Sequence, residues 1–84
     1  MNLYKISQTV NTSWDTYSVA IVAAETPEAA RRIHPSPALQ DDPEWIEKSW
    51  FRGWAHPDQV QAEYIGEASP GTAAGVILAS FNAG

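Results

Sequence analysis

The sequence predicts one small α+β domain, with a mostly antiparallel sheet of four or five strands and one short helix. Alternating or continuous apolar segments recur along the chain and are separated by clusters of Pro, Gly, Asn and Ser, which is typical of strands joined by turns. One segment, which begins at Thr26-Pro27, combines a helix start with apolar residues at helical spacing. The length of 84 residues fits a single domain, and 44% hydrophobic with 18% charged residues favours a folded chain.

Residues 3–10 are expected to form the first strand, because apolar and polar side chains alternate along them. One face would carry Tyr4, Ile6, Gln8 and Val10, and the other Leu3, Lys5 and Ser7. The polar residues 11–16 favour a hairpin loop, since their short side chains hydrogen-bond nearby backbone groups. Residues 17–24 then supply a second, largely buried strand.

A short helix is expected over residues 27–33. Thr26 can accept a hydrogen bond from a free amide of the first turn, and Pro27 is tolerated at the first helical position. Pro35 restricts the residue before it and lacks an amide donor, so the helix should end near residue 33 or 34.

Residues 42–54 have two interpretations. Asp42-Pro43-Glu44 has the cap, proline and acid of a helix start, and Ile46, Trp50 and Trp54 follow at spacings of four. A strand would also suit the aromatic content, although neither of its faces would be polar. We favour an irregular, variable insertion over residues 36–53 that ends in a short strand around 49–54.

The last third of the chain predicts two more strands. Residues 57–59 form a turn or a single helical turn, and residues 60–68 alternate as in a half-exposed strand. Ser69-Pro70-Gly71 turns the chain, and residues 76–81 form the most apolar run, which is the best candidate for a central strand. The aliphatic residues expected in the core are Val19, Ile21, Ile65 and Ile77.

Composition excludes several classes of function. The absence of cysteine excludes disulfides, a thiolate nucleophile, cysteine-ligated zinc and iron–sulfur clusters. Five scattered Lys and Arg residues argue against nucleic acid and anionic membrane as partners. No run approaches the roughly 18 to 20 apolar residues of a membrane span, and the start of the chain lacks the features of a signal peptide, so a cytoplasmic location is expected.

The net charge of −5 comes entirely from residues 36–67. This acidic stretch is either a solvated surface or a face for a basic protein partner. The acids that would contact such a partner are Asp41, Asp42, Glu44 and Glu47.

The two His-Pro dipeptides raise the question of a metal site. His34 and His56 are separated by 22 positions and lack a helical H-x-x-x-H arrangement, so Asp58, Asp41 or Asp42 would have to complete the ligand set. No G-x-S-x-G sequence is present, and no set of nucleophile, base and orienting group can be assembled. We therefore predict no metal, no cofactor and no catalytic residue. His34 would instead interact with the last carbonyls of the helix.

The segment 69–75 suggests an alternative function. Its glycines could form a backbone amide concavity for an anion, such as a nucleotide phosphate, although it lacks the Lys-Ser/Thr of a P-loop. The residues of this alternative site are Arg31, Gly71, Thr72 and Gly75. The simpler interpretation is a connection into the last strand.

Four large aromatic rings within ten residues are the most unusual feature of the chain. Tryptophan and arginine dominate binding hot spots, and Arg52 lies among these rings. The rings either complete a small core or form an interface, with self-association included in the second interpretation. The rings are those of Trp45, Trp50, Phe51 and Trp54.

Both ends of the chain carry a recognisable pattern. Tyr4-Lys5-Ile6-Ser7-Gln8 followed by Asp15-Thr16-Tyr17, and the ending from Gly75-Val76-Ile77 to Ser80-Phe81-Asn82-Ala83-Gly84, resemble a family of short, uncharacterised bacteriophage proteins. The middle, from Ser36 to Gly53, is where such proteins vary most. The resemblance implies a phage origin and brings no activity with it.

These observations lead to a functional expectation. By analogy with other small phage proteins, we expect an accessory protein that inhibits a host antiviral defence protein, in an anti-CRISPR-like manner, by stoichiometric binding. The aromatic cluster and the acids beside it would contact a host bacterial protein with a basic surface. The alternative is an oligomeric protein that sequesters a nucleotide signal, and a small enzyme ranks third.

Overall fold

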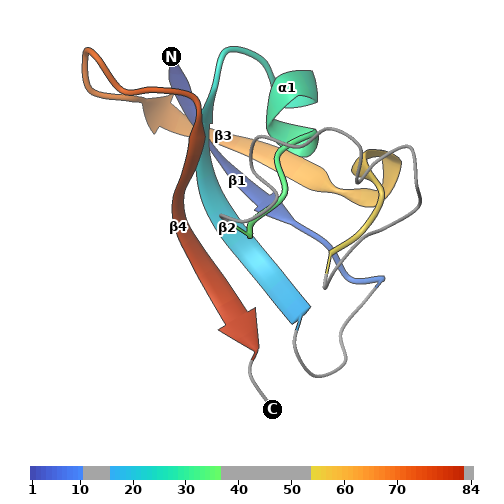
Figure 1. Ribbon diagram of the computed structural model, residues 1–84. Coiled ribbons are helices and arrows are strands. Elements are labelled where there is room, and N and C mark those ends of the chain that lie inside the picture. Colours follow the sequence, from blue (N-terminus) through green and yellow to red (C-terminus); the bar gives the residue numbers. More distant parts are fainter. Residues whose placement is uncertain (11–15, 37–53, 83–84) are drawn as a thin grey trace.

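The computed structural model describes residues 1–10, 16–36 and 54–82. Within these residues, four strands form one antiparallel sheet, accompanied by one α-helix and one 3-10 turn (Figure 1). The elements are β1 (Asn2–Ser7), β2 (Thr16–Ala24), α1 (Pro27–Arg31), η2 (Pro57–Gln59), β3 (Gln61–Glu67) and β4 (Gly75–Asn82). The prediction of an α+β domain with an antiparallel sheet is confirmed with four strands. The strand expected around 49–54 lies outside the described residues except for Trp54, which is not in a strand.

The strand order is β3-β1-β2-β4, so the hairpin of β1 and β2 occupies the centre of the sheet. Lys5 lies opposite Ile21 of β2 on one side and Glu63 of β3 on the other. β4 pairs with β2 and forms an edge. The prediction of a central strand over 76–81 was therefore wrong. An apolar run is typical of a strand that is covered on both faces, and β4 instead leaves large apolar side chains exposed.

Three inserted residues interrupt the register of the sheet. Ile65 of β3 lies between the pairs made by Leu3 and Tyr4, and Ile77 of β4 lies between the pairs made by Ile21 and Val22. Ser18 of β2 is the third. Each inserted residue bends its strand and locally increases the twist. Both edge strands are therefore irregular at one position.

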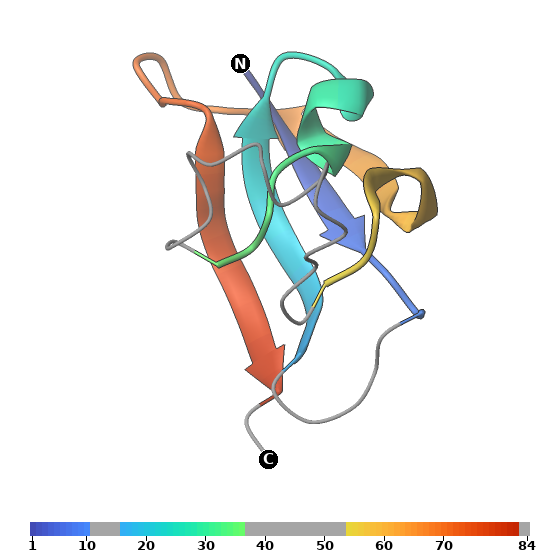
Figure 2. The ribbon, with the colours of Figure 1, turned by 45° about the vertical axis from the view of Figure 1, so that its right-hand side comes forward.

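The hydrophobic core lies on the face of the sheet that α1 covers (Figure 2). Ala30 of α1 packs with the sheet, and the segment that leads into β3 adds further side chains. Alanines in β2 allow this close approach because they project little from the sheet. The buried residues of this cluster are Tyr4, Ile6, Ala20, Val22, Ala24, Ala30, Trp54, Ala55 and Val60.

The four aliphatic residues expected in the core lie elsewhere. Val19 and Ile21 are only half-buried, whereas Ile65 is 48% and Ile77 is 53% exposed. β2 is apolar on both of its faces, and the helix packs against the face with the smaller side chains. The expectation was wrong because alternation alone does not show which of two apolar faces is covered.

Helix α1 begins as predicted and ends earlier. Thr26 Oγ1 accepts a hydrogen bond from the Ala29 amide at 3.1 Å, and Pro27 occupies the first turn. The Arg32 amide donates to the Ala29 carbonyl and the Ile33 amide to the Ala30 carbonyl, each at 3.2 Å. These are three-residue rather than four-residue spacings, so the chain leaves the helix through a tighter turn after Arg31.

Candidate functional site

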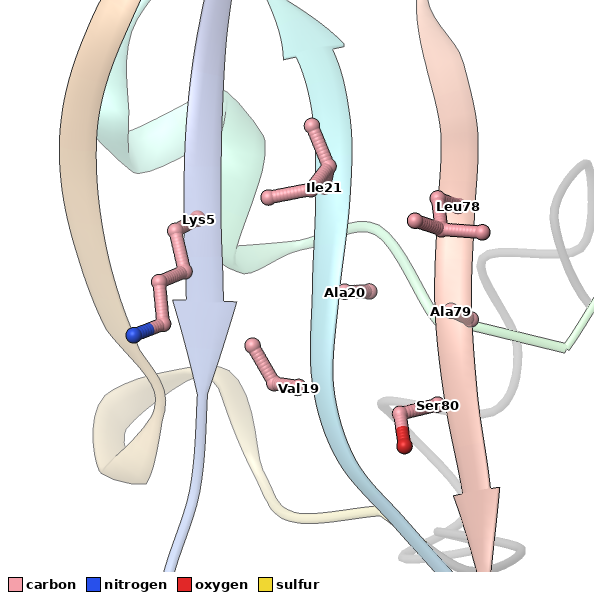
Figure 3. Close-up of a pocket in the computed structure, with 7 residues that line it drawn as sticks. All are labelled: Lys5, Val19, Ala20, Ile21, Leu78, Ala79 and Ser80. Carbon is pink, nitrogen blue, oxygen red and sulfur yellow. The ribbon is translucent and has the colours of Figure 1, made fainter.

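The side of the sheet opposite α1 carries large apolar side chains. We call it the outer face and define it by Lys5, Val19, Ile21, Leu78 and Ser80, which come from three adjacent strands. Figure 3 shows these side chains in front of the sheet, with α1 behind it. Within residues 1–10, 16–36 and 54–82, no helix lies on this face. Among the described residues, the sheet is thus covered on one side and open on the other.

A shallow pocket of about 480 Å³ opens on the outer face. Leu78 is 68% exposed beside it, the largest exposure among the large hydrophobic residues whose side chains the structure describes. The pocket is lined by Lys5, Val19, Ala20, Ile21, Leu78, Ala79 and Ser80. Large exposed apolar patches with a polar rim are typical of interaction sites, so this face is the candidate surface among the described residues.

Lys5 gives the pocket its charge. It is the only lysine or arginine in the four strands, and among the described residues it forms no ion pair. Its aliphatic stem can lie along Ile21 while the ammonium group stays in water. The pocket therefore offers an apolar floor with a single cation at its side.

Lys5 and Ser80 are the polar side chains among the five residues that define the outer face. They belong to β1 and β4, which β2 separates. Two strand spacings amount to about 10 Å, so these two side chains do not form a direct hydrogen bond with each other.

The aromatic and acidic residues predicted to bind a partner lie outside the described residues, with the exception of Trp54. These are Asp41, Asp42, Glu44, Glu47, Trp45, Trp50, Phe51 and Arg52. Trp54 is 1% exposed and packs in the core cluster with residues such as Ile6 and Val60. Of the two roles that the sequence left open for these rings, Trp54 takes the one in the core.

The residues of the alternative ligand site are not brought together. Arg31 pairs with Glu28 on α1 at 3.8 Å. Gly71 has a positive φ of 85° in the turn that Thr72 Oγ1 closes by donating to the Ser69 carbonyl at 2.7 Å. Gly75 lies opposite Ala23 at the start of β4. In both views the turn and α1 lie apart, with the central strands between them (Figures 1 and 2).

Both histidines accept a backbone hydrogen bond across the proline that follows them. His34 Nδ1 accepts from the Ser36 amide at 3.0 Å, and His56 Nδ1 accepts from the Asp58 amide at 3.1 Å. Each imidazole thus closes a turn in the way that an Asn or Asp side chain does. His34 is fully buried, with its ring 6.3 Å from that of Tyr17. In the described part of the chain no three His, Asp or Glu residues gather as a metal site would require.

The outer face was missed at the level of sequence, although a signal for it was present. Residues 17–24 are apolar at both odd and even positions. The α-helix that the described residues include covers one face of the sheet, so the second apolar face stays open among these residues. Val19, Ile21 and Leu78 are the residues that this argument would have identified.

The side chains of the outer face do not identify one class of protein. Among the described residues, no helix is both long and apolar enough to cross a membrane. An open sheet face can serve many functions, so the fold alone does not assign one. Comparison of the chain with protein-family models, with curated proteins and with solved structures finds no match.

Proposed function

We propose that this chain acts by stoichiometric binding to another protein and that the outer face is its docking surface. The proposal depends on the 68% exposure of Leu78, which lines the pocket together with Val19 and Ile21. Burying exposed apolar area contributes about 25 cal/mol per Å² before the entropic cost of association. A partner that covers this pocket therefore gains free energy by burying the exposed side chain of Leu78.

The charge distribution indicates the kind of partner. The net charge of −5 attracts a protein with a basic surface over distances of about one Debye length, which speeds encounter. At the pocket itself the sign reverses, because Lys5 is the cation there. The partner would bring an apolar patch and, beside it, a carboxylate or carbonyl oxygen that accepts from Lys5.

The biological role follows from the sequence resemblance. A small phage protein that binds without catalysis fits an accessory role in the cytoplasm of an infected bacterium, where it inhibits a host antiviral defence protein. The separation of Lys5 from Ser80 by a strand supports binding over an enzymatic role. The sequence also predicts a contact through the acids and rings between Asp41 and Arg52, which lie outside the described residues.

Capture of a partner with matched variants tests this proposal. The tagged chain, Leu78→Ser and Ile65→Ser are each exposed to lysate of the bacterial host. Both substitutions remove an exposed aliphatic group, but Leu78 lines the pocket and Ile65 lies at the bulge of β3. We expect a stoichiometric partner that the chain and Ile65→Ser retain and Leu78→Ser loses.

Two results would contradict it. One is capture of the same proteins by all three chains, since the pocket would then play no part in docking. The other is that no host protein is captured at all. Circular dichroism of each variant shows that the fold is kept, because both positions are exposed and their substitution should leave stability nearly unchanged.

A further inference from the structure

The two edges of the sheet differ in how they are protected. Exposed strand edges invite pairing with another chain, and proteins usually block them with charges, proline or bulges. β3 carries Glu63 and Glu67 on its edge, both exposed. β4, from Gly75 to Asn82, contains neither a charged residue nor a proline. The β3 edge is therefore protected by charged side chains, and the β4 edge is not.

From Leu78 onward β4 has no inserted residue of its own. The strand carries its inserted residue at Ile77, near its start. Leu78, Ala79 and Ser80 pair in order with β2, and the register shift between Ser80 and Phe81 arises from Ser18 of β2. Within the described residues, no strand pairs with the free side of β4. Residues 78–82 thus offer the backbone donors and acceptors of a strand without a bulge of its own.

We propose that β4 pairs with β4 of a second copy of this chain. The two strands run antiparallel about a two-fold axis near Ser80, the middle of the regular stretch, and join two sheets into one of eight strands. This is a closed, self-complementary contact, because the same residues face each other from both sides. The proposal does not depend on the proposed function.

Charge argues for a second copy at this edge. Two chains of net charge −5 repel each other, so they associate with least cost where the surface carries no charge. β2 and β4 contain no charged residue at all, whereas pairing through β3 would bring its glutamates close to those of the copy. A different protein that recognises charged side chains would have none to bind on β4. A second copy of β4 can pair through backbone donors and acceptors alone.

The composition of the core points the same way. Among the described residues, half of the buried apolar side chains are alanines, namely Ala20, Ala23, Ala24, Ala30 and Ala55. Domains of this size gain little from one core and often gain the remainder by oligomerisation. Pairing at β4 shields Leu78, which is 68% exposed. Stability then rises with the concentration of the chain itself.

One cross-strand row of the sheet supplies a matched pair of variants. Ser80 of β4 lies opposite Val19, Val19 opposite Ser7, and Ser7 opposite Gln61 of β3. Ser80 and Gln61 are both exposed and end the same row at opposite edges. Ser80→Lys and Gln61→Lys therefore add the same charge on the same face, at the proposed interface and away from it.

Molar mass in solution is the first measurement, by light scattering after size exclusion at about 100 μM, where a Kd of about 1 μM gives mostly dimer. We expect the chain and Gln61→Lys to be dimers. Ser80→Lys sets two like charges opposite each other and should weaken association at least about tenfold. A monomeric parent chain overturns the proposal, and so does an equal effect of the two lysines.

Hydrogen exchange identifies the contact itself. In a lone edge strand alternate amides point to solvent and exchange fast, whereas pairing protects both sets. We expect protection at consecutive amides of residues 78–82 in the dimer, and alternating protection after dilution or in Ser80→Lys. A dimer in which the alternation persists would associate through another surface, such as the outer face, and would refute pairing at β4. Alternating protection in Ser80→Lys also shows that this variant has kept the sheet.

Discussion

The ring of Tyr4 stands edge-on to the ring of Tyr64, with centroids 5.9 Å apart and planes at 71°. The two residues are opposite each other in β1 and β3. Tyr4 is 3% exposed, whereas Tyr64 is 57% exposed and lies over it at the rim of the core. The contact fixes the register of the edge strand at the position next to the bulge at Ile65.

Replacement of Tyr64 by alanine should weaken the attachment of β3. Edge-to-face aromatic pairs contribute about 0.5–1.5 kcal/mol beyond the area that they bury, so we expect a loss of about 1 kcal/mol or more in the free energy of unfolding. Urea denaturation measures it. Tyr64→Phe keeps the ring and should lie within about 0.5 kcal/mol of the parent chain. Equal losses in both variants would show that the hydroxyl, not the ring, stabilises β3.

Thr26 should account for much of the stability of the short helix. Its side chain accepts from the Ala29 amide, and removal of such a cap costs about 1 kcal/mol. Thr26→Ala should show this loss in urea denaturation, whereas Thr26→Ser retains the hydroxyl and should stay near the parent value. If Thr26→Ala is neutral, the packing of Ala30 alone holds α1 in place.

The turns at the two histidines should tolerate asparagine. An Asn side-chain oxygen can accept from the amide two residues later, as His56 Nδ1 does from Asp58. We expect His56→Asn to be near neutral and His56→Ala to lose about 0.5–1.5 kcal/mol. His34→Ala should lose about 2 kcal/mol or more, because it also leaves a cavity at a fully buried site. Similar losses for the two alanine variants would show that burial of His34 adds nothing to the effect of its hydrogen bond.

Two tryptophans should respond differently to substitution. Trp54→Ala removes a ring that is 1% exposed, so we expect a loss of about 3–5 kcal/mol, which is enough to unfold a small domain. If Trp50 is a hot spot, Trp50→Ala should keep the circular dichroism spectrum and speed dissociation from the partner, at a cost of about 2 kcal/mol. Unfolding of Trp50→Ala would assign that ring to the core as well.

Local chemistry made the strands and turns predictable from the sequence. Alternation in residues 3–10, the cap at Thr26 and the Ser69-Pro70-Gly71 turn each depend on neighbours in the chain, and each has its counterpart in the structure. The helical turn at residues 57–59 is present for the same reason. Segment type is decided by side chains that lie close together in sequence.

The choice of face and the strand order could not be predicted in this way. Ile21 and Val22 are adjacent and equally apolar, yet Val22 is fully buried and Ile21 only half-buried. The difference arises from the position of α1, which packs against the alanines of β2. The hydrophobicity of these alanines alone does not show which face of the strand the helix covers. The same contact decides that the pocket beside Leu78 opens on the other side. The role of Trp54 in the core also depends on a distant part of the chain.

The strand order has a kinetic consequence. Only β1 and β2 are neighbours both in the sheet and along the chain, and a hairpin of this kind forms in about 1–10 μs. Every residue pair between β1 and β3, and between β2 and β4, joins positions more than fifty residues apart. Closing such long loops carries an entropic cost before any contact repays it, and sheets with non-local pairing fold in milliseconds to seconds. We therefore expect the central hairpin to form first, with both of its sides open, and the pairing of the two flanking strands to be the slow step of folding.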